Sequence, residues 1–71
     1  MKAVVCFKNN DTKPVEITGL KSVSNNAKSY KEKEIRTNFC LAPDTYFLIV
    51  GEKESLTANS ADILYVIFIE D

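Results

Sequence analysis

The sequence predicts an all-β fold, a small antiparallel meander of five or six strands that curls into a barrel or a sandwich. Short apolar segments alternate with clusters of turn-forming residues, and no segment carries a sustained apolar stripe at helical spacing. The longest apolar segment, Ile63 to Ile69, contains no polar residue. A strand that is apolar on both faces needs cover on both faces, so this segment calls for a second layer or a partner subunit.

The first part of the chain predicts a hairpin followed by a bent strand. Residues 2–8 are rich in β-forming residues, and the turn formers Asn9 to Thr12 connect them to a half-buried strand that begins at Pro14. Gly19 interrupts this second segment, which we expect to bend or bulge there.

Residues 27–38 are ambiguous, because their composition favours a helix but their apolar residues do not form a helical stripe. The alternation of Ile35, Thr37, Phe39 and Leu41 with polar residues favours a strand from about Glu34 to Leu41. The alternative is an α+β, β-grasp-like mixed sheet, with one short helix at about residues 26–36 and the two terminal strands side by side at its centre.

The second half of the chain predicts three further strands separated by tight turns. Residues 42–45 form a proline-containing reverse turn, and residues 46–50 form an apolar strand. A turn at residues 51–54 leads into a short half-buried strand at residues 56–58. Residues 59–62 then turn the chain into the last strand.

The length of 71 residues corresponds to a single small β-rich domain, residues 1–71, which needs additional stabilisation at this size. Cys6 and Cys40 lie in apolar segments and are expected to be buried thiols rather than a disulfide. The chain has no histidine, so we expect no metal site and no cofactor. Oligomerisation is therefore the leading candidate for the missing stabilisation.

The composition also argues against catalysis. Without histidine the chain lacks the base of Ser-His and Cys-His pairs and the commonest general acid near neutral pH. Its terminal run of seven apolar residues is too short to span a membrane, and the N-terminus lacks a signal-peptide pattern. We therefore expect a cytoplasmic protein that is not an enzyme and does not bind a membrane.

The sequence predicts a non-catalytic interaction or assembly module of bacterial or phage type, which forms a homo-oligomer or binds a protein partner that the sequence does not identify. Its source is inferred from small size and from the lack of targeting signals and catalytic residues. Apolar strand residues are the candidates for the subunit interface. These are Phe47, Tyr65, Ile67 and Ile69.

The alternative function is nucleic-acid binding through a basic cluster that contains an aromatic ring. Its members are Lys28, Tyr30, Lys31, Lys33 and Arg36. Residues 1–36 carry eight basic and four acidic residues, whereas residues 37–71 carry one basic and six acidic residues. Two acidic residues inside the cluster and the overall pI of about 5.3 weigh against this function.

Overall fold

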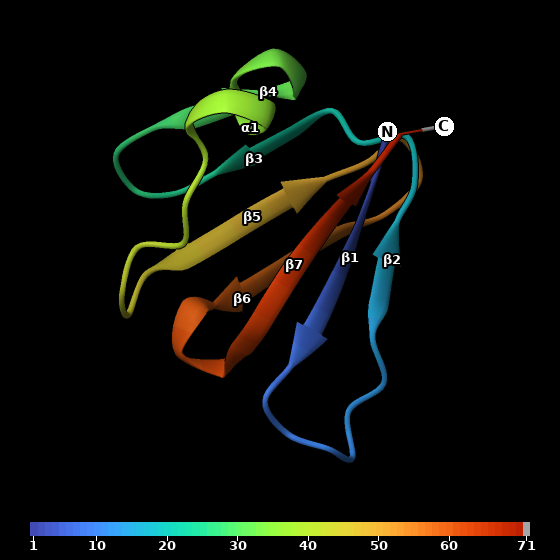
Figure 1. Cartoon of the computed structure of the whole chain (residues 1–71), viewed down its shortest axis with the longest axis vertical. Coiled ribbons are helices and arrows are strands. Elements are labelled where there is room, and N and C mark those ends of the chain that lie inside the picture. Colours follow the sequence, from blue (N-terminus) through green and yellow to red (C-terminus); the bar gives the residue numbers. More distant parts are fainter. Residues whose placement is uncertain (71) are drawn as a thin grey trace.

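The computed structural model describes residues 1–70 of the chain, with Asn38 described by its backbone alone. Over these residues, seven strands form two antiparallel sheets and are joined by one short α-helix and one 3-10 turn (Figure 1). The elements are β1 (Lys2–Phe7), β2 (Val15–Ile17), β3 (Ser22–Ser24), β4 (Ser29–Lys31), α1 (Glu32–Asn38), β5 (Tyr46–Val50), β6 (Ser55–Asn59), η1 (Ser60–Asp62) and β7 (Ile63–Ile69). The predicted all-β, sandwich-like class is confirmed, whereas a closed barrel is not formed.

The strands divide into a three-stranded sheet, ordered β2-β1-β7, and a four-stranded sheet, ordered β4-β3-β5-β6. Every pairing between described strands is antiparallel, so the mixed sheet of the β-grasp alternative is not formed. That alternative did place the terminal strands side by side, and β1 does pair with β7. The segment after Gly19 makes a strand of its own, β3, and forms a hairpin with β4, which raises the strand count above the predicted five or six.

The core lies between the two sheets. Its buried residues are Ala3, Val5, Ile17, Leu20, Val23, Ile35, Phe47, Ile49 and Ile63. Phe39 extends this core at one side of the sandwich, where its ring makes edge-to-face contacts with three other aromatic rings. The centroid distances are 5.4 Å to Tyr30, 5.6 Å to Phe47 and 5.5 Å to Phe68. One side chain thereby connects β4 and β5 of the larger sheet with β7 of the smaller one.

The predicted strand from Glu34 to Leu41 is wrong, because residues 32–38 form helix α1. Among helical residues 32–37, Ile35 alone is buried in the core, so one buried side chain anchors the helix in place of a continuous apolar stripe. Glu32 and Arg36 form an i,i+4 ion pair of 3.1 Å, and acidic residues in the first turn with a basic residue in the last turn suit the helix dipole. The ion pair, the helix dipole and the helix propensity of these residues thus outweigh the weak alternation of apolar and polar residues that predicted a strand.

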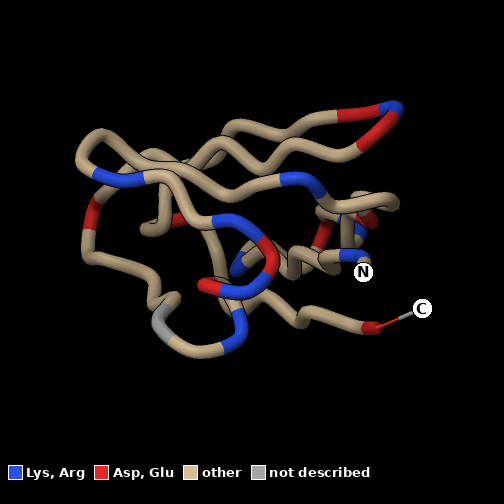
Figure 2. Tube along the Cα trace, turned by 90° about the horizontal axis from the view of Figure 1, so that it is seen from above, with Lys and Arg blue, Asp and Glu red and all other residues tan. Residues whose placement is uncertain are grey.

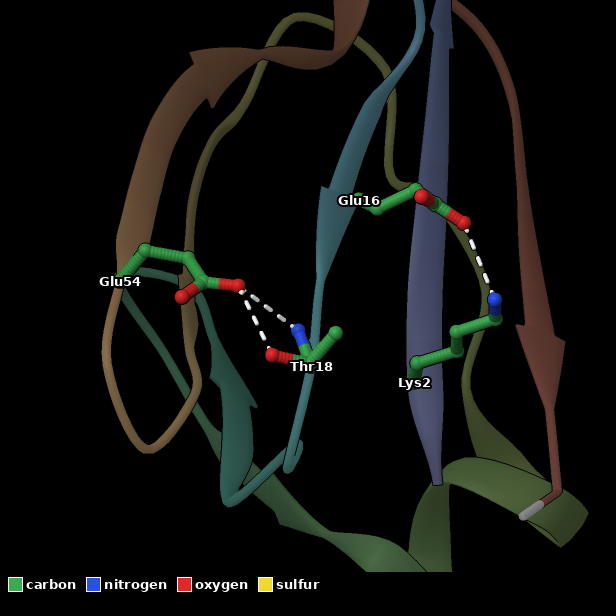
Figure 3. Close-up of polar contacts among 4 residues, drawn as sticks. All are labelled: Lys2, Glu16, Thr18 and Glu54. Atoms are coloured by element: carbon green, nitrogen blue, oxygen red, sulfur yellow. Dashed lines mark hydrogen bonds and ion pairs between the residues drawn. The ribbon is translucent and has the colours of Figure 1, made fainter.

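The chain crosses from the smaller sheet to the larger one at Gly19, which has a φ of +58°. The turn of the β5–β6 hairpin packs against this crossing: the Thr18 N–H and hydroxyl donate to Glu54 Oε1 at 2.9 and 3.1 Å (Figure 3). The backbone approaches so closely that a Cβ on Gly51 would lie 2.5 Å from the Thr18 carbonyl oxygen and 2.7 Å from Ile17 Cγ2. Gly51 is therefore required by the contact between the two sheets.

We expect Gly51→Ala to lower the free energy of unfolding by about 1–3 kcal/mol, because the added methyl group overpacks a backbone contact. Urea denaturation followed by circular dichroism measures this change. Lys53→Ala, in the same turn and exposed, is the control and should change stability by less than about 0.5 kcal/mol. Equal stabilities for the two variants would contradict the role assigned to Gly51.

Candidate functional site

The outer face of the smaller sheet carries an apolar surface on β7. In the β1–β7 register, buried Ala3 and Val5 oppose Phe68 and Val66, which pack against the core. Alternation along the strand places Tyr65, Ile67 and Ile69 on the opposite, outer face. Their exposed fractions are 48%, 44% and 40%.

Leu64 adds a fourth exposed side chain to this surface. The register shifts by one residue between Cys6 and Phe7, so that Cys6 opposes Tyr65 but Phe7 opposes Ile63. Leu64 is the extra residue of this bulge and is 59% exposed. We call Leu64, Tyr65, Ile67 and Ile69 the β7 surface; the uninterrupted apolar run predicted three of these residues and missed Leu64.

Phe47, the remaining predicted interface residue, does not belong to this surface. It is 1% exposed and lies in the core of the chain, so its assignment to a subunit interface is wrong. Its neighbours Tyr46 and Leu48 face outward instead, at 60% and 40% exposure. An apolar run of five residues gives no sign of which set faces inward, and cross-strand packing decides it: Phe47 opposes Ala58, next to the core.

The outer face of the larger sheet has a different character. The register places hydroxyl side chains of Ser22, Ser24, Ser29 and Thr57 on the same face as Leu48. Tyr46 and Leu48 are both exposed on this face, but polar side chains of the neighbouring strands lie beside them, since Tyr46 opposes Asn59 and Leu48 opposes Ser24 and Thr57. Apolar residues among polar ones are usual for soluble proteins, whereas an apolar stripe without polar neighbours marks an interaction surface. The contrast between the two outer faces identifies the β7 surface as the candidate functional site.

β7 is also an edge strand, since β1 is its only partner among the described strands. Natural sheets protect their edges with short strands, charged residues or proline. Two of the other three edge strands, β2 and β4, have three residues each, with Glu16 in β2 and Lys31 in β4, and Pro14 precedes β2. The third, β6, has five residues and contains no charge and no proline. β7 has seven residues and none of these protective features.

A groove of about 370 Å³ borders β7. Its lining combines β7 with α1 and the segment that follows it: Ile35, Phe39, Cys40, Leu41, Leu64, Tyr65, Val66 and Phe68. Cys40 is exposed here rather than buried as predicted, and Cys6 is half-buried. Both are free thiols, in agreement with the prediction that they do not form a disulfide. Sequence reasoning did not find this groove, because it depends on the helix that the alternation pattern concealed.

Tyr65 and Cys6 lie opposite each other on the outer face of the β1–β7 pair. A hydrogen bond with the Cys6 side chain raises the pKa of the Tyr65 phenol, and repulsion by the Cys6 thiolate and loss of hydration raise it further. The phenol therefore stays protonated to higher pH in the folded protein.

The basic cluster is brought together on α1, on β4 and just before β4, but two of its four basic side chains are paired with carboxylates. Lys28 lies 3.9 Å from a Glu34 oxygen, and Arg36 pairs with both Glu32 and Glu70. Tyr30 is half-buried, with its ring against Phe39 on one side and the Lys28 ammonium 4.9 Å from its centroid. Lys31 and Lys33 have no ion pair among the described residues. Figure 2 shows basic and acidic residues interspersed over the fold rather than separated on two faces.

A second hollow, of about 730 Å³, lies between the β1–β2 turn and the β5–β6–η1 corner. Phe7 and Tyr46 contribute rings to it, and Lys8 and Asp62 contribute opposite charges. Among the described residues, no cluster of three or more Cys, Asp or Glu side chains is arranged to hold a metal ion.

No protein-family model, curated protein or solved structure matches the chain. Within residues 1–70, no helix has the length and apolar character needed to cross a membrane.

We expect Cys6→Ala to lower the pKa of Tyr65 toward the ordinary tyrosine range, because it removes both the hydrogen bond and the thiolate. The raised pKa favours the folded state while the phenol is protonated, and this contribution is lost as pH rises through that pKa. NMR titration of ring-labelled tyrosine measures the shift, with Cys40→Ala as the control. A Tyr65 midpoint that is the same in the wild type and in Cys6→Ala would contradict the assignment.

Proposed function

We propose that this protein is a non-catalytic assembly module that forms homo-oligomers through the β7 surface. The observation that carries the proposal is the set of four large apolar side chains, 40–59% exposed, on a strand that contains no charge and no proline. Burying one such side chain completely is worth about 1.5–3 kcal/mol. Association through this surface therefore removes an unfavourable contact of these four side chains with water.

A second copy of the chain suits this surface better than an unrelated protein. Lys2 and Glu16 form a 3.0 Å ion pair beside the apolar stripe, on the same outer face (Figure 3). A patch that contains both signs at its rim is self-complementary under a two-fold rotation, since the cation of one subunit can meet the anion of the other. The apolar side chains of the β7 surface then contact the same side chains of the second subunit.

This role requires neither a cofactor nor a metal, and it suits a chain without histidine. We retain the cytoplasmic location and the bacterial or phage type as parts of the proposal, on the features of the sequence that suggested them.

We expect the wild type to sediment as a dimer or larger species at tens of micromolar, and Ile67→Lys to shift the chain toward the monomer with an apparent Kd raised at least tenfold. Placing a charge in a desolvated contact costs more than about 1.4 kcal/mol, which corresponds to that factor. Sedimentation velocity measures both species.

Leu48→Lys is the matched control, because Leu48 has 40% exposure on a strand of the other sheet. It should leave the association unchanged. A wild-type chain that remains an 8.0 kDa monomer at tens of micromolar would overturn the proposed function.

Nucleic-acid binding is the competing function, and the pairing of Lys28 and Arg36 with carboxylates argues against it. We expect no change in the fluorescence anisotropy of labelled DNA or RNA oligonucleotides at low salt, where phosphate attraction is strongest. Saturable binding that is lost in Lys31→Glu/Lys33→Glu would establish the basic cluster as the site instead.

A further inference from the structure

Some backbone groups of β7 point to its outer edge, where they have no hydrogen-bond partner among the described residues. The Met1 carbonyl accepts from the Leu20 N–H on the β2 side at 2.8 Å. Since backbone groups alternate in direction along an antiparallel strand, Lys2 and Val4 direct theirs toward β7. The backbone N–H and C=O groups of their partners, Ile69 and Ile67, point back toward β1 and complete these hydrogen bonds.

Val66 and Phe68 are the alternate residues of β7, so their N–H and C=O groups point away from β1 toward the open edge. The groove of about 370 Å³ lies along this edge, and both residues line it. An edge with unpaired backbone groups beside an apolar groove has the form of a site for strand addition.

We propose that β7 pairs antiparallel with β7 of a second copy about a two-fold axis, which joins two three-stranded sheets into one of six strands, β2-β1-β7-β7-β1-β2. This inference rests on the proposed self-association and specifies its geometry. It differs from packing of the outer faces against each other, which would leave the edge open.

The charges at the two ends of β7 suit this pairing. At the start of the strand, Lys8 and Asp62 lie together, because the Lys8 N–H donates to the Asp62 carbonyl oxygen at 3.0 Å. At its end, Arg36 pairs with Glu70. Each end thus carries one basic and one acidic residue, so antiparallel pairing, which brings the start of one strand to the end of the other, does not place ends of like net charge together.

A stable interface takes up so large a share of the surface of this small chain that the contact must extend beyond the edge of β7. A stable interface buries about 800 Å² per subunit, which is roughly one sixth of the 4714 Å² of accessible surface. Strand pairing at the edge places the partner over the groove and beside Leu64 and Tyr65. The edge, the groove and part of the β7 surface then contribute to one contact.

Amide hydrogen exchange, read residue by residue by NMR, tests this geometry on the wild-type chain at two concentrations, one above and one below the association midpoint. We expect exchange at Val66 and Phe68 to slow at least tenfold in the associated state, because their N–H groups gain strand partners. The Val4 N–H is the internal control, since its partner lies within the chain. Its protection relative to global unfolding should change much less.

The outcomes separate the two proposals. Association with slowed exchange at Val66 and Phe68 supports edge pairing. Association with unchanged exchange at both residues overturns edge pairing and leaves the proposed function standing, with the outer faces in contact. Absence of association even at tens of micromolar overturns both, and the edge would then be available to a strand of another protein. Ile67→Lys provides a second monomeric reference, in which both amides should exchange rapidly.

Discussion

The Phe39 ring determines how the two sheets meet. It contacts Tyr30, Phe47 and Phe68 edge to face, and these rings come from strands of both sheets. Such pairs contribute about 0.5–1.5 kcal/mol each beyond the area that they bury, so Phe39 is the main contact by which the segment between α1 and β5 closes this side of the sandwich. The groove along β7 is a direct consequence, because Phe39 fixes the segment that forms its opposite wall.

The same arrangement explains why β7 is left with an uncovered face. The core and Phe39 cover Val66 and Phe68. The helix that precedes Phe39 packs on this inner side rather than over the outer face. Between residues 1 and 70 there is no further helix or sheet to lie over the outer face. The two-sided apolar character of the strand thus divides into an inner face covered within the chain and an exposed outer face, which the proposed association would cover.

The turn-forming residues made much of the fold predictable from the sequence. Which face of each strand turns toward the core was not predictable in the same way. The turns at residues 9–12 and 51–54 separate strands as expected, and the turn at residues 42–45 leads into β5 as expected although a helix precedes it, because these residues favour tight reversals irrespective of context. The inward position of Phe47 and the helix at residues 32–38 depend on tertiary contacts that short apolar patterns do not specify. The β7 surface was partly predictable for the opposite reason: a strand with no polar residue must expose apolar side chains wherever its second face lies.

The bulge at Leu64 shows how closely that exposure is tied to the core. Without it, simple alternation would place Ile63 on the same face as Tyr65, Ile67 and Ile69, yet Ile63 is 3% exposed and they are not buried. The extra residue lets Ile63 enter the core while the rest of the outer set faces solvent. A face that only met water could carry polar residues at no cost to this packing, as Ser22 and Ser24 do on the other sheet. Apolar residues at all three outer positions of β7 are therefore better explained by contact with a second chain than by the needs of the monomer's own core.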